Sequence, residues 1–224
     1  MNTRFFVDFD GTITKNDVID MILERFAKPE WKKIEKDWSQ GRIGSRECLE
    51  KQMRLVQASP ADLKKLVSEV ELDVTFISFL KKTKKLSVPV IIVSDGLDWV
   101  IREVLKNNFQ KSPELISEME IYSNRLDWKK NGVGISFPNG PVCAHACANC
   151  KERIMKNLSA ADDFVVFVGD GLSDRTAAGA ATLTFAKNEL LGFCEQNKIK
   201  HRRYTNFNDI SKWLSSRKAS YVTV

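Results

Sequence analysis

Asp8 and Asp10 are the first residues of the chain whose types and spacing suggest chemistry. They directly follow the strand-forming run Arg4–Val7 and precede Gly11. Side chains two residues apart on a strand point to the same side, so both carboxylates can reach one site if the strand continues through them. Two such acids before a turn-forming glycine indicate metal binding and acid–base chemistry. An ordinary strand that ends in a polar turn would explain the same residues.

Polar residues also follow two later strands of the chain. Val88–Val93 and Phe164–Val168 are continuous apolar runs, which is typical of parallel strands buried on both faces. The first run leads into Ser94, and the second leads into Asp170 and Asp174. Ligands of open α/β sheets bind beyond the carboxyl ends of the strands. We therefore expect these side chains to meet the first acids at one edge of the sheet.

Helices and strands alternate from residue 74 onward, and this alternation predicts a doubly wound α/β fold with a mostly parallel sheet. We expect a further strand over 182–185, short extended pieces within 119–137 and a C-terminal helix near 208–216. These elements form the frame that must position the polar strand ends.

Residues 16–71 have the pattern of four short helices without a strand signal. Each expected start has a capping residue or a first-turn proline before apolar positions at helical spacing. These starts are Asn16 or Asp17, then Pro29, Ser45 and Ser59. We therefore predict an α/β core formed by residues 1–13 and 76–224, with an inserted helical-bundle cap formed by residues 14–75.

The composition is that of a globular protein, since 43% of the 224 residues are hydrophobic and 29% are charged. No stretch approaches the roughly 20 apolar residues of a membrane helix. The N-terminus lacks the features of a secretory signal. The odd number of five cysteines fits a reducing compartment better than a disulfide framework. We expect a cytoplasmic protein without a membrane partner.

The net charge of +6 would permit nucleic-acid binding and would also attract a phosphorylated anion. The lysines are scattered in pairs such as Lys32-Lys33 and Lys84-Lys85, which is the usual pattern of solvated helix faces. We therefore expect a small phosphorylated metabolite as ligand and argue against nucleic acid. Nothing in the sequence specifies an oligomeric state.

Four ordered motifs resemble those of the haloacid dehalogenase superfamily, most of whose members are phosphatases. The motifs are Asp8-Phe9-Asp10-Gly11-Thr12, Ser94 after a buried strand, Lys151 before a helix, and Gly169-Asp170-Gly171-Leu172-Ser173-Asp174. The helical insert resembles the cap of the phosphoserine-phosphatase-like branch. The resemblance implies a Rossmann-like core, and Gly11-Thr12 with the acid Asp10 fits phosphoryl transfer better than dehalogenation.

The resemblance also implies a mechanism. Asp8 would attack phosphorus and form an aspartyl-phosphate. Asp10 would protonate the leaving oxygen and then deprotonate the hydrolytic water. Mg²⁺ would be held by the Asp8 carboxylate, the Asp10 main-chain carbonyl and Asp170.

Further residues would bind the phosphoryl group and the substrate. Ser94 and Lys151 would hold the phosphoryl oxygens, and Asp174 would orient Lys151 or the metal shell. Each also has an ordinary explanation, as a helix cap, a surface lysine or an acid in a helix N-terminal turn. The remaining residues expected around the phosphate and substrate are Gly11, Thr12, Asp17, Asp95 and Gly96.

Two departures from phosphoserine phosphatases bear on the substrate. Asp17 lies where the substrate-binding acid of their cap falls, but the arginine position is occupied by Gln52, with Arg46 and Arg54 nearby. Losing that arginine would weaken recognition of a carboxylate. Ser-Asp-Gly, with Asp95 in the middle, replaces the usual Ser-Gly-Gly.

The segment before Lys151 carries Cys143, His145, Cys147 and Cys150. Such a run resembles the methionine-salvage phosphatases, which act on 2-hydroxy-3-keto-5-methylthiopentenyl-1-phosphate. Four cap residues could line a site for its apolar thioether tail or could form bundle core instead: Phe26, Trp31, Trp38 and Met53. A phosphoserine phosphatase, or another small-metabolite phosphatase or phosphotransferase, is the alternative.

The spacing of the three cysteines is open to a second interpretation. With His145 or a distant cysteine, they could hold structural zinc or an iron–sulfur cluster. A zinc- or iron–sulfur-containing nucleic-acid-binding module is the corresponding rival function. Small thiols that fill space beside the lysine helix would explain the same residues.

Overall fold

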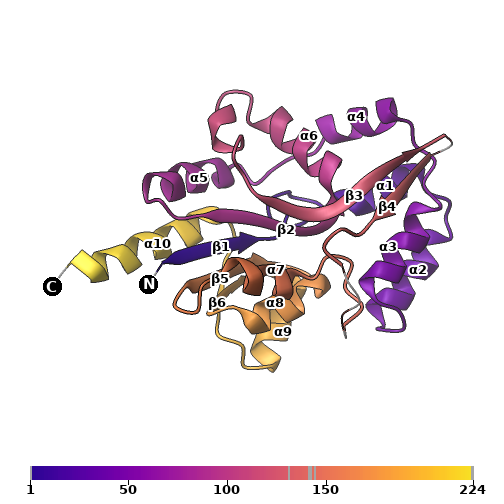
Figure 1. Cartoon of the computed structure of the whole chain (residues 1–224). Helices are drawn as coiled ribbons and strands as arrows, with labels where there is room; N and C mark the ends of the chain where they lie inside the picture. Colours follow the sequence, from indigo (N-terminus) through magenta and orange to yellow (C-terminus); the bar gives the residue numbers. More distant parts are fainter. Residues whose placement is uncertain (1, 131, 141–142, 144, 223–224) are drawn as a thin grey trace.

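The structure is a computed structural model that describes residues 2–130, 132–140, 143 and 145–222, with side chains through residue 217. Within these residues the strands form a seven-stranded sheet in the order β4-β3-β2-β1-β5-β6-β7 (Figure 1). Neighbouring strands are parallel except for the antiparallel pair β3–β4. The strands are β1 (Thr3–Val7), β2 (Val90–Leu97), β3 (Ile121–Lys129), β4 (Gly132–Ser136), β5 (Phe164–Gly169), β6 (Leu183–Ala186) and β7 (His201–Arg203).

The direction of strand addition reverses at β1, which lies between β2 and β5. The chain first extends the sheet from β1 through β2 and β3, and later extends it on the other side through β5, β6 and β7. Such a reversal opens a crevice beyond the carboxyl ends of the strands, where open α/β sheets bind ligands. Asp8 and Asp10 follow β1 at this point.

Helices cover both faces of the sheet, which confirms the predicted doubly wound α/β architecture (Figure 1). One apolar cluster joins the sheet to α5, α6 and α10, and a second joins the opposite face to α7, α8 and α9. The core helices are α5 (Thr75–Lys85), α6 (Asp98–Asn108), α7 (Lys151–Leu158), α8 (Arg175–Ala180), α9 (Asn188–Gln196) and α10 (Phe207–Val222), with short 3₁₀ turns at Pro113–Leu115 and Leu172–Asp174.

Alternation along β1 assigns its side chains to the two clusters. Phe5 packs against Phe79 with ring centroids 5.1 Å apart, and Phe79 also meets Phe207 at 5.2 Å. Phe6, one residue further, points to the other face and belongs to the second cluster. The rings of Phe5, Phe6, Phe79 and Phe207 are all fully buried. β1 is therefore an apolar strand that packs against other side chains on both faces of the sheet.

Four helices lie in the segment where the sequence predicts a cap. Asp17 caps the first, since its side chain accepts the N–H of Asp20 at 3.0 Å. Ser59 and Asp62 form a reciprocal capping box at the fourth. The cap helices are α1 (Val18–Phe26), α2 (Trp31–Ser39), α3 (Ser45–Met53) and α4 (Pro60–Ser68).

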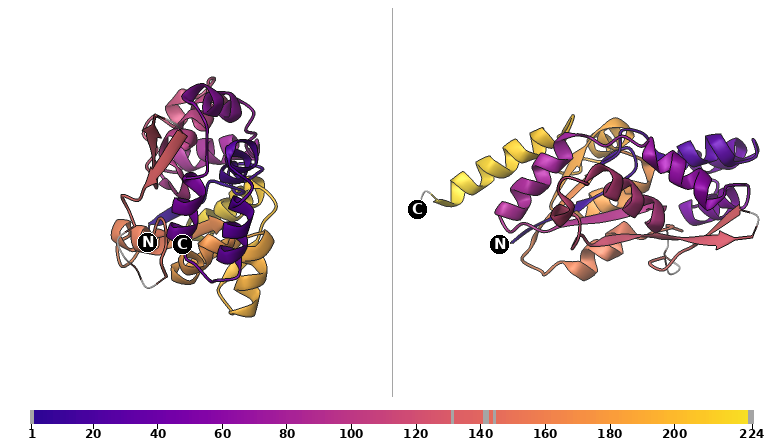
Figure 2. Two further views of the ribbon diagram at one scale, coloured as in Figure 1. Left: turned by 90° about the vertical axis from the view of Figure 1, so that its right-hand side faces the viewer. Right: turned by 90° about the horizontal axis from the view of Figure 1, so that it is seen from above.

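The two connections between the cap helices and the sheet run side by side. Thr14 and Leu72 form an isolated antiparallel bridge, and the N–H of Asp73 donates to the Ile13 carbonyl at 2.8 Å. The α2 and α3 helices lie at the opposite end of the molecule from the start of β1 (Figure 2). The first apolar cluster nevertheless runs continuously from the sheet into the cap helices, so a separate cap domain over residues 14–75 stays a prediction.

β1 is shorter than the sequence pattern suggests. It ends at Val7, so Asp8 and Asp10 lie in the turn that follows the strand and do not continue its alternation. The left-handed conformation of Gly11, with φ of +67°, reverses the chain there. A turn rather than a strand therefore brings both carboxylates to the same pocket.

β2 is longer than expected and continues past Val93 to Leu97, so Ser94 lies within the strand. Its pairing with β3 shifts register between Val93 and Leu97. The side-chain amide of Asn149 donates to the carbonyls of Ser94 and Tyr122, at 2.9 and 2.8 Å, and so bridges the two strands. The sequence pattern did not predict this part of β2, because polar residues follow its apolar run.

β3 is one strand where the sequence suggested two pieces, and α10 extends six residues beyond its expected end at residue 216. β7 was missed because its three residues, His201–Arg203, are polar and partly exposed at the sheet edge. None of these three differences changes the frame of the site.

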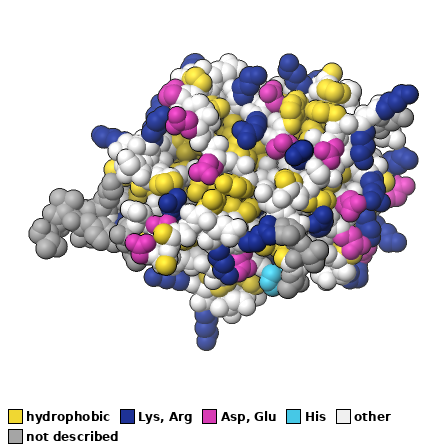
Figure 3. Space-filling view, in the orientation of Figure 1, with side chains coloured by type: hydrophobic (Ala, Val, Ile, Leu, Met, Phe, Trp, Pro, Cys, Tyr) yellow, Lys and Arg dark blue, Asp and Glu magenta, His cyan; other side chains and the backbone are white. Residues whose placement is uncertain are grey.

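No helix among the described residues combines the length and apolar character needed to cross a membrane. On the face shown in Figure 3, lysine and arginine side chains are dispersed among acidic and apolar ones and do not gather into a stripe. This dispersal agrees with the expectation that the positive charge is spread over solvated surface.

Phe79→Ala should lower the free energy of unfolding by about 3–5 kcal/mol, because it empties the junction of Phe5, Phe76 and Phe207. Chemical denaturation measures the change. Val74→Ala is the matched control, since Val74 is 75% exposed and its truncation should cost less than about 0.5 kcal/mol. Equal losses in the two variants would contradict the assignment of this ring cluster as core.

Candidate active site

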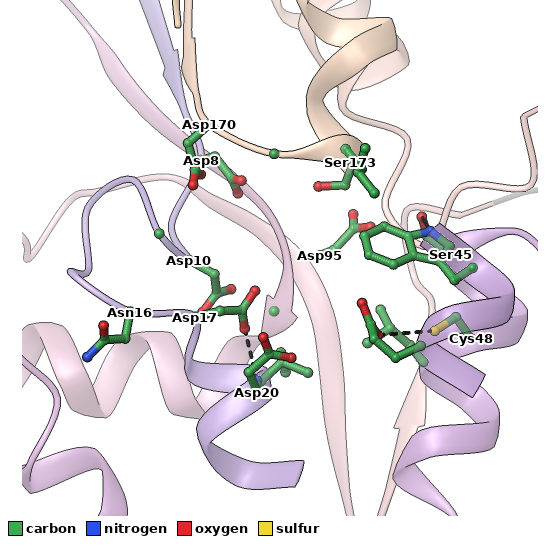
Figure 4. A pocket seen from close by; sticks show the side chains of 18 of the residues that line it. Asp8, Asp10, Asn16, Asp17, Asp20, Ser45, Cys48, Asp95, Asp170 and Ser173 are labelled. Atoms are coloured by element: carbon green, nitrogen blue, oxygen red, sulfur yellow. Dashed lines mark hydrogen bonds between the residues drawn. The ribbon is translucent and has the colours of Figure 1, made fainter. Parts of the chain in front are cut away.

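A pocket opens where the carboxyl ends of the central strands face the cap helices α1, α2 and α3 (Figure 4). The sheet side contributes carboxylates that point into it (Figure 4). The cap side contributes polar and apolar side chains from all three helices. Seven of the residues expected from the sequence line the pocket: Asp8, Asp10, Gly11, Asp17, Asp95, Gly96 and Asp170.

Lys151 is the centre of a buried ion network. Its Nζ lies 2.9 Å from Asp8 Oδ1 and 2.7 Å from Asp174 Oδ1, and the residue is only 1% exposed. Burial alone would lower the pKa of Lys151, but the negative charges of Asp174 and Asp8 outweigh it and raise the pKa. Lys151 therefore remains an ammonium group, fixed at the first position of α7 against the end of β1.

Asp174 connects this network to the turn after β5. Its Oδ2 accepts the main-chain N–H groups of Asp170 and Gly171, at 2.9 and 3.1 Å, while Oδ1 accepts from Lys151. A Cβ at Gly169 would lie 2.4 Å from Asp174 Oδ2, so only glycine leaves room for this carboxylate. Asp174 is fully buried and accepts a hydrogen bond from Lys151 at 2.7 Å, and its role in orienting Lys151 or the metal shell stays a prediction.

Asp170 is held by two donors. Thr12 Oγ1 donates to its Oδ1 at 2.9 Å, and Asn188 Nδ2 donates to its Oδ2 at 3.1 Å. Gly11 approaches so closely that a Cβ there would lie 2.6 Å from Asp170 Oδ2. Asn188 was missed by the sequence interpretation, although it follows β6 as the other site residues follow their strands.

The acids suit a hard cation. One oxygen from each of Asp8, Asp170 and Asp174 lies within 4.8 Å of the others. Burial and then the charge of Asp174 raise the pKa of Asp8 well above its usual value. An oxygen-rich site crowded with carboxylates is what Mg²⁺ prefers in proteins, so these residues fit that ion. Asp8 and Asp170 line the pocket whereas Asp174 does not, which leaves Asp8 and Asp170 as the candidate ligands.

Asp10 has a different environment from Asp8. Its Oδ1 accepts the Val18 N–H at 3.0 Å, and its Oδ2 accepts from Ser94 Oγ at 3.2 Å. Withdrawal from water, with the nearby charge of Asp17, raises the pKa of Asp10 to about 8. In the absence of a cation, Asp10 therefore carries a proton near neutral pH. Asp8 differs in having the Lys151 ammonium as its direct partner.

The predicted phosphate-binding groups lie around this pair. Ser94 Oγ accepts the Gly96 N–H at 2.9 Å, and the Gly11 N–H donates to Thr14 Oγ1 at 3.1 Å. A Cβ at Gly96 would lie 2.7 Å from Asp10 Oδ2, so glycine permits this close approach. Asp95 also faces the pocket, where burial raises its pKa to about 6 although Lys151 opposes the rise.

The cap wall is polar and negatively charged. The carboxylates of Asp17, Asp20, Glu24 and Glu35 line it. Gln52 is buried and donates to Glu35 at 2.8 Å. The nearby arginines lie elsewhere: Arg46 Nη1 donates to the Gly140 carbonyl, and Arg54 pairs with Glu50.

Some apolar cap residues line the pocket, and others form the core of the helical bundle. Trp38 lines the pocket, together with Ile19 and Leu49. Trp31 and Met53 belong to the apolar cluster that the cap shares with the sheet, and the partly buried Phe26 packs against it. Trp38 is fixed by the hydrogen bond from its Nε1 to Ser45 Oγ at 3.1 Å.

The cysteine run forms a separate cluster. The Sγ atoms of Cys143, Cys147 and Cys150 lie within 4.8 Å of one another. His145 is exposed and is not part of this group.

Residues 5–179 match the family described as haloacid dehalogenase-like hydrolase. Relatives from Bacillus pumilus (strain SAFR-032) and Bacillus mycoides (strain KBAB4) are 30% and 29% identical over 207 and 214 residues. Both are named 2-hydroxy-3-keto-5-methylthiopentenyl-1-phosphate phosphatase. The alignment covers 91% of this chain and 87% of the first relative, and 94% of both chains for the second.

Solved structures with a similar fold include a substrate-bound phosphoserine phosphatase complex, with a TM-score of 0.72 and 21% identity over 95% of this chain and 98% of that chain. Cytosolic 5′-nucleotidase IIIB bound to cytidine has a TM-score of 0.64 and 16% identity, over 96% and 84% of the two chains. At these identities the likeness shows the fold alone.

Without a divalent cation, Asp10→Asn should be more stable than the wild type at pH 8, and the difference should shrink towards pH 4. The pKa of Asp10 is about 8 in the folded protein against 3.8 ordinarily, so wild-type stability is lost as the pH rises through this window. Asparagine has no proton to lose and therefore does not become charged in the buried site.

Urea unfolding in chelating buffer at several pH values measures this difference. Asp162→Asn, a change at an exposed position, should follow the wild type throughout. A difference that stays constant from pH 4 to pH 8 would show that Asp10 does not titrate as its surroundings imply.

Proposed function

This chain belongs to the haloacid dehalogenase-like hydrolases and is a phosphatase, and we propose that it hydrolyses a small phosphorylated metabolite through an aspartyl-phosphate on Asp8. The observation that carries this proposal is the meeting of Asp8, Lys151 and Asp170 where the strand order reverses. These groups supply a nucleophile, a buried cation and an acidic metal ligand in one pocket.

Asp8 is the proposed nucleophile because its carboxylate faces the pocket and is held by Lys151 at 2.9 Å. Its Oδ1 also accepts the Phe9 N–H at 2.8 Å, which limits rotation of the side chain. Lys151 is placed to stabilise negative charge on the transferring phosphoryl group. Ser94 and the N–H of Gly96 would add donors once the Ser94 hydroxyl turns from Asp10 towards the phosphate.

Asp8, Asp170 and the main-chain carbonyl of Asp10 would hold Mg²⁺. When bound, the ion offsets the repulsion between the carboxylates and the phosphate and polarises the phosphoryl oxygen. Thr12 and Asn188 keep the Asp170 carboxylate in place for this role.

Asp10 is the proposed acid and base. It carries the proton that the leaving oxygen needs, and after transfer its carboxylate can accept a proton from the attacking water. Val18 and Ser94 fix its two oxygens, so the side chain keeps one orientation through both steps. The first cap helix therefore contributes directly to positioning Asp10.

We propose 2-hydroxy-3-keto-5-methylthiopentenyl-1-phosphate as the substrate. The names of the Bacillus relatives support this choice. Ile19, Trp38 and Leu49 provide apolar surface for a thioether tail on the cap side of the pocket. Gln52 supplies no positive charge that would select a carboxylate.

Phosphoserine is the second candidate, because the acidic cap wall would attract its ammonium group. Its carboxylate would face Glu35 and Asp20 without an arginine among the described pocket-lining residues. The same wall would accept an amine that lacks a carboxylate, so phosphoethanolamine separates the two effects.

Asp8→Asn should reduce turnover of a generic phosphomonoester by at least about 1,000-fold, equivalent to about 4 kcal/mol in the barrier, because an amide cannot form the aspartyl-phosphate. Initial rates with saturating Mg²⁺ measure this loss. Asp162→Asn makes the same chemical change outside the pocket and should retain wild-type turnover. Retained turnover in a folded Asp8→Asn protein would exclude Asp8 as the nucleophile.

A panel of phosphorylated metabolites, each with Mg²⁺ added and withheld, tests the substrate. We expect the enol-type thioether phosphate to give the highest kcat/KM, phosphoserine to be poor and every activity to require the cation. Phosphoserine as the best substrate would overturn the assignment, and phosphoethanolamine as the best would make the acidic cap wall the main determinant.

A further inference from the structure

The cluster of Cys143, Cys147 and Cys150 has no part in the proposed phosphatase mechanism. All three cysteines are free, and their Sγ atoms lie within 4.8 Å of one another. Tetrahedral zinc with bonds of about 2.3 Å to sulfur holds its thiolates about 3.8 Å apart. The thiols therefore already have nearly the separation that one ion would require.

The backbone of this segment is shaped around the sulfur atoms. The N–H of Cys147 donates to Cys143 Sγ at 3.3 Å, and the N–H of Ala146 donates to the Cys143 carbonyl at 3.0 Å. Ala146 has a φ of +49°, a conformation that is costly for a residue with a Cβ. A main-chain hydrogen bond to sulfur, such as the one that Cys147 donates, orients sulfur ligands in metal sites. Three thiols that merely fill space would not need a strained turn.

The cluster lies between two parts of the phosphatase site. Cys150 immediately precedes Lys151 and caps α7. On the other side, the Ala146 carbonyl accepts the N–H of Arg46 at 3.2 Å, at the start of cap helix α3. A Cβ at Gly44 would lie 2.4 Å from the Ala146 Cβ, so this turn contacts the cap closely.

We propose that Cys143, Cys147 and Cys150 bind a single zinc ion, with the fourth position open to water or an external ligand. Three thiolates select a soft, thiophilic cation over Mg²⁺. In a [4Fe–4S] cluster each cysteine binds a different iron, which separates the sulfur atoms further than in this cluster. Among the described residues no histidine or carboxylate completes the group, so three protein ligands are the set available.

A zinc ion here would fasten the turn that joins α3 to the helix carrying Lys151. Its three zinc–thiolate bonds would fix the conformation of Ala146 and the adjoining start of α7. The ion would therefore help to hold the active site in place, and its site would be distinct from the acidic site at Asp8 and Asp170.

Metal content and cobalt substitution test the proposal on the full chain. Protein purified under reducing conditions should contain one zinc per chain by elemental analysis. Cobalt added to the zinc-free protein should give the thiolate-to-metal charge-transfer absorption of tetrahedral coordination. Cys147→Ser and Cys143→Ser should each lose the zinc and the absorption; Cys143 is partly exposed, so its replacement should leave the fold intact by circular dichroism.

Two control variants separate this site from the rest of the protein. Cys194→Ala removes a buried cysteine of the second apolar cluster and should keep the zinc. Asp170→Asn removes a ligand of the proposed Mg²⁺ site and should also keep it. Three outcomes would each overturn the proposal. The first is a fully reduced wild-type protein that binds neither zinc nor cobalt, and the second is a protein that contains iron in place of zinc. The third is zinc that is lost with Asp170→Asn and kept with Cys147→Ser.

Discussion

The buried Lys151 ammonium between Asp8 and Asp174 is the interaction on which the rest of the site depends. A charge removed from water is tolerated only with close partners, and here each partner belongs to a different strand end. Asp174 also accepts a main-chain N–H after β5, so Lys151 is tied to the end of that strand. Asp8 directly follows β1, so Lys151 is tied to the end of that strand as well. The ion network thus fixes the relative positions of three segments that are far apart in sequence. Gly169 makes the network sterically feasible by having no side chain.

Two carboxylates of one short motif acquire different properties from this arrangement. Asp8 faces an ammonium group, whereas Asp10 faces a serine hydroxyl and a helix N–H. The environment, rather than the residue type, therefore separates the proposed nucleophile from the proposed proton carrier. Because Asp10 is bound to the first turn of the cap, the geometry of the acid depends on the insertion that follows it.

The α/β architecture, the four cap helices and the strand-end acids could be predicted from the sequence because local patterns encode them. Apolar runs specify buried strands, and capping residues mark helix starts. The polar continuation of β2 and the partly exposed β7 could not be predicted, because tertiary contacts define them. An example is the hydrogen bond from Asn149 to the Ser94 carbonyl of β2. Asn188, the acidic cap wall and the orientation of Gln52 require knowledge of which helix face meets the sheet. The cysteine spacing was visible, but the exclusion of His145 depends on the path of a turn.

The central position of β1 has a consequence for the way in which the molecule is assembled. On one side of β1, Phe5–Val7 pair with Val90–Ile92 of β2. On the other side, Thr3–Val7 pair with Phe164–Val168 of β5. The first strand of the chain therefore keeps an unpaired edge until β5 is available, and closing such long loops slows folding. Asp170 and Asp174 follow β5 in the chain, so they can meet Asp8 only when this pairing is made. Catalytic competence is consequently a property of the complete sheet, and an N-terminal fragment that ends before β5 cannot form it.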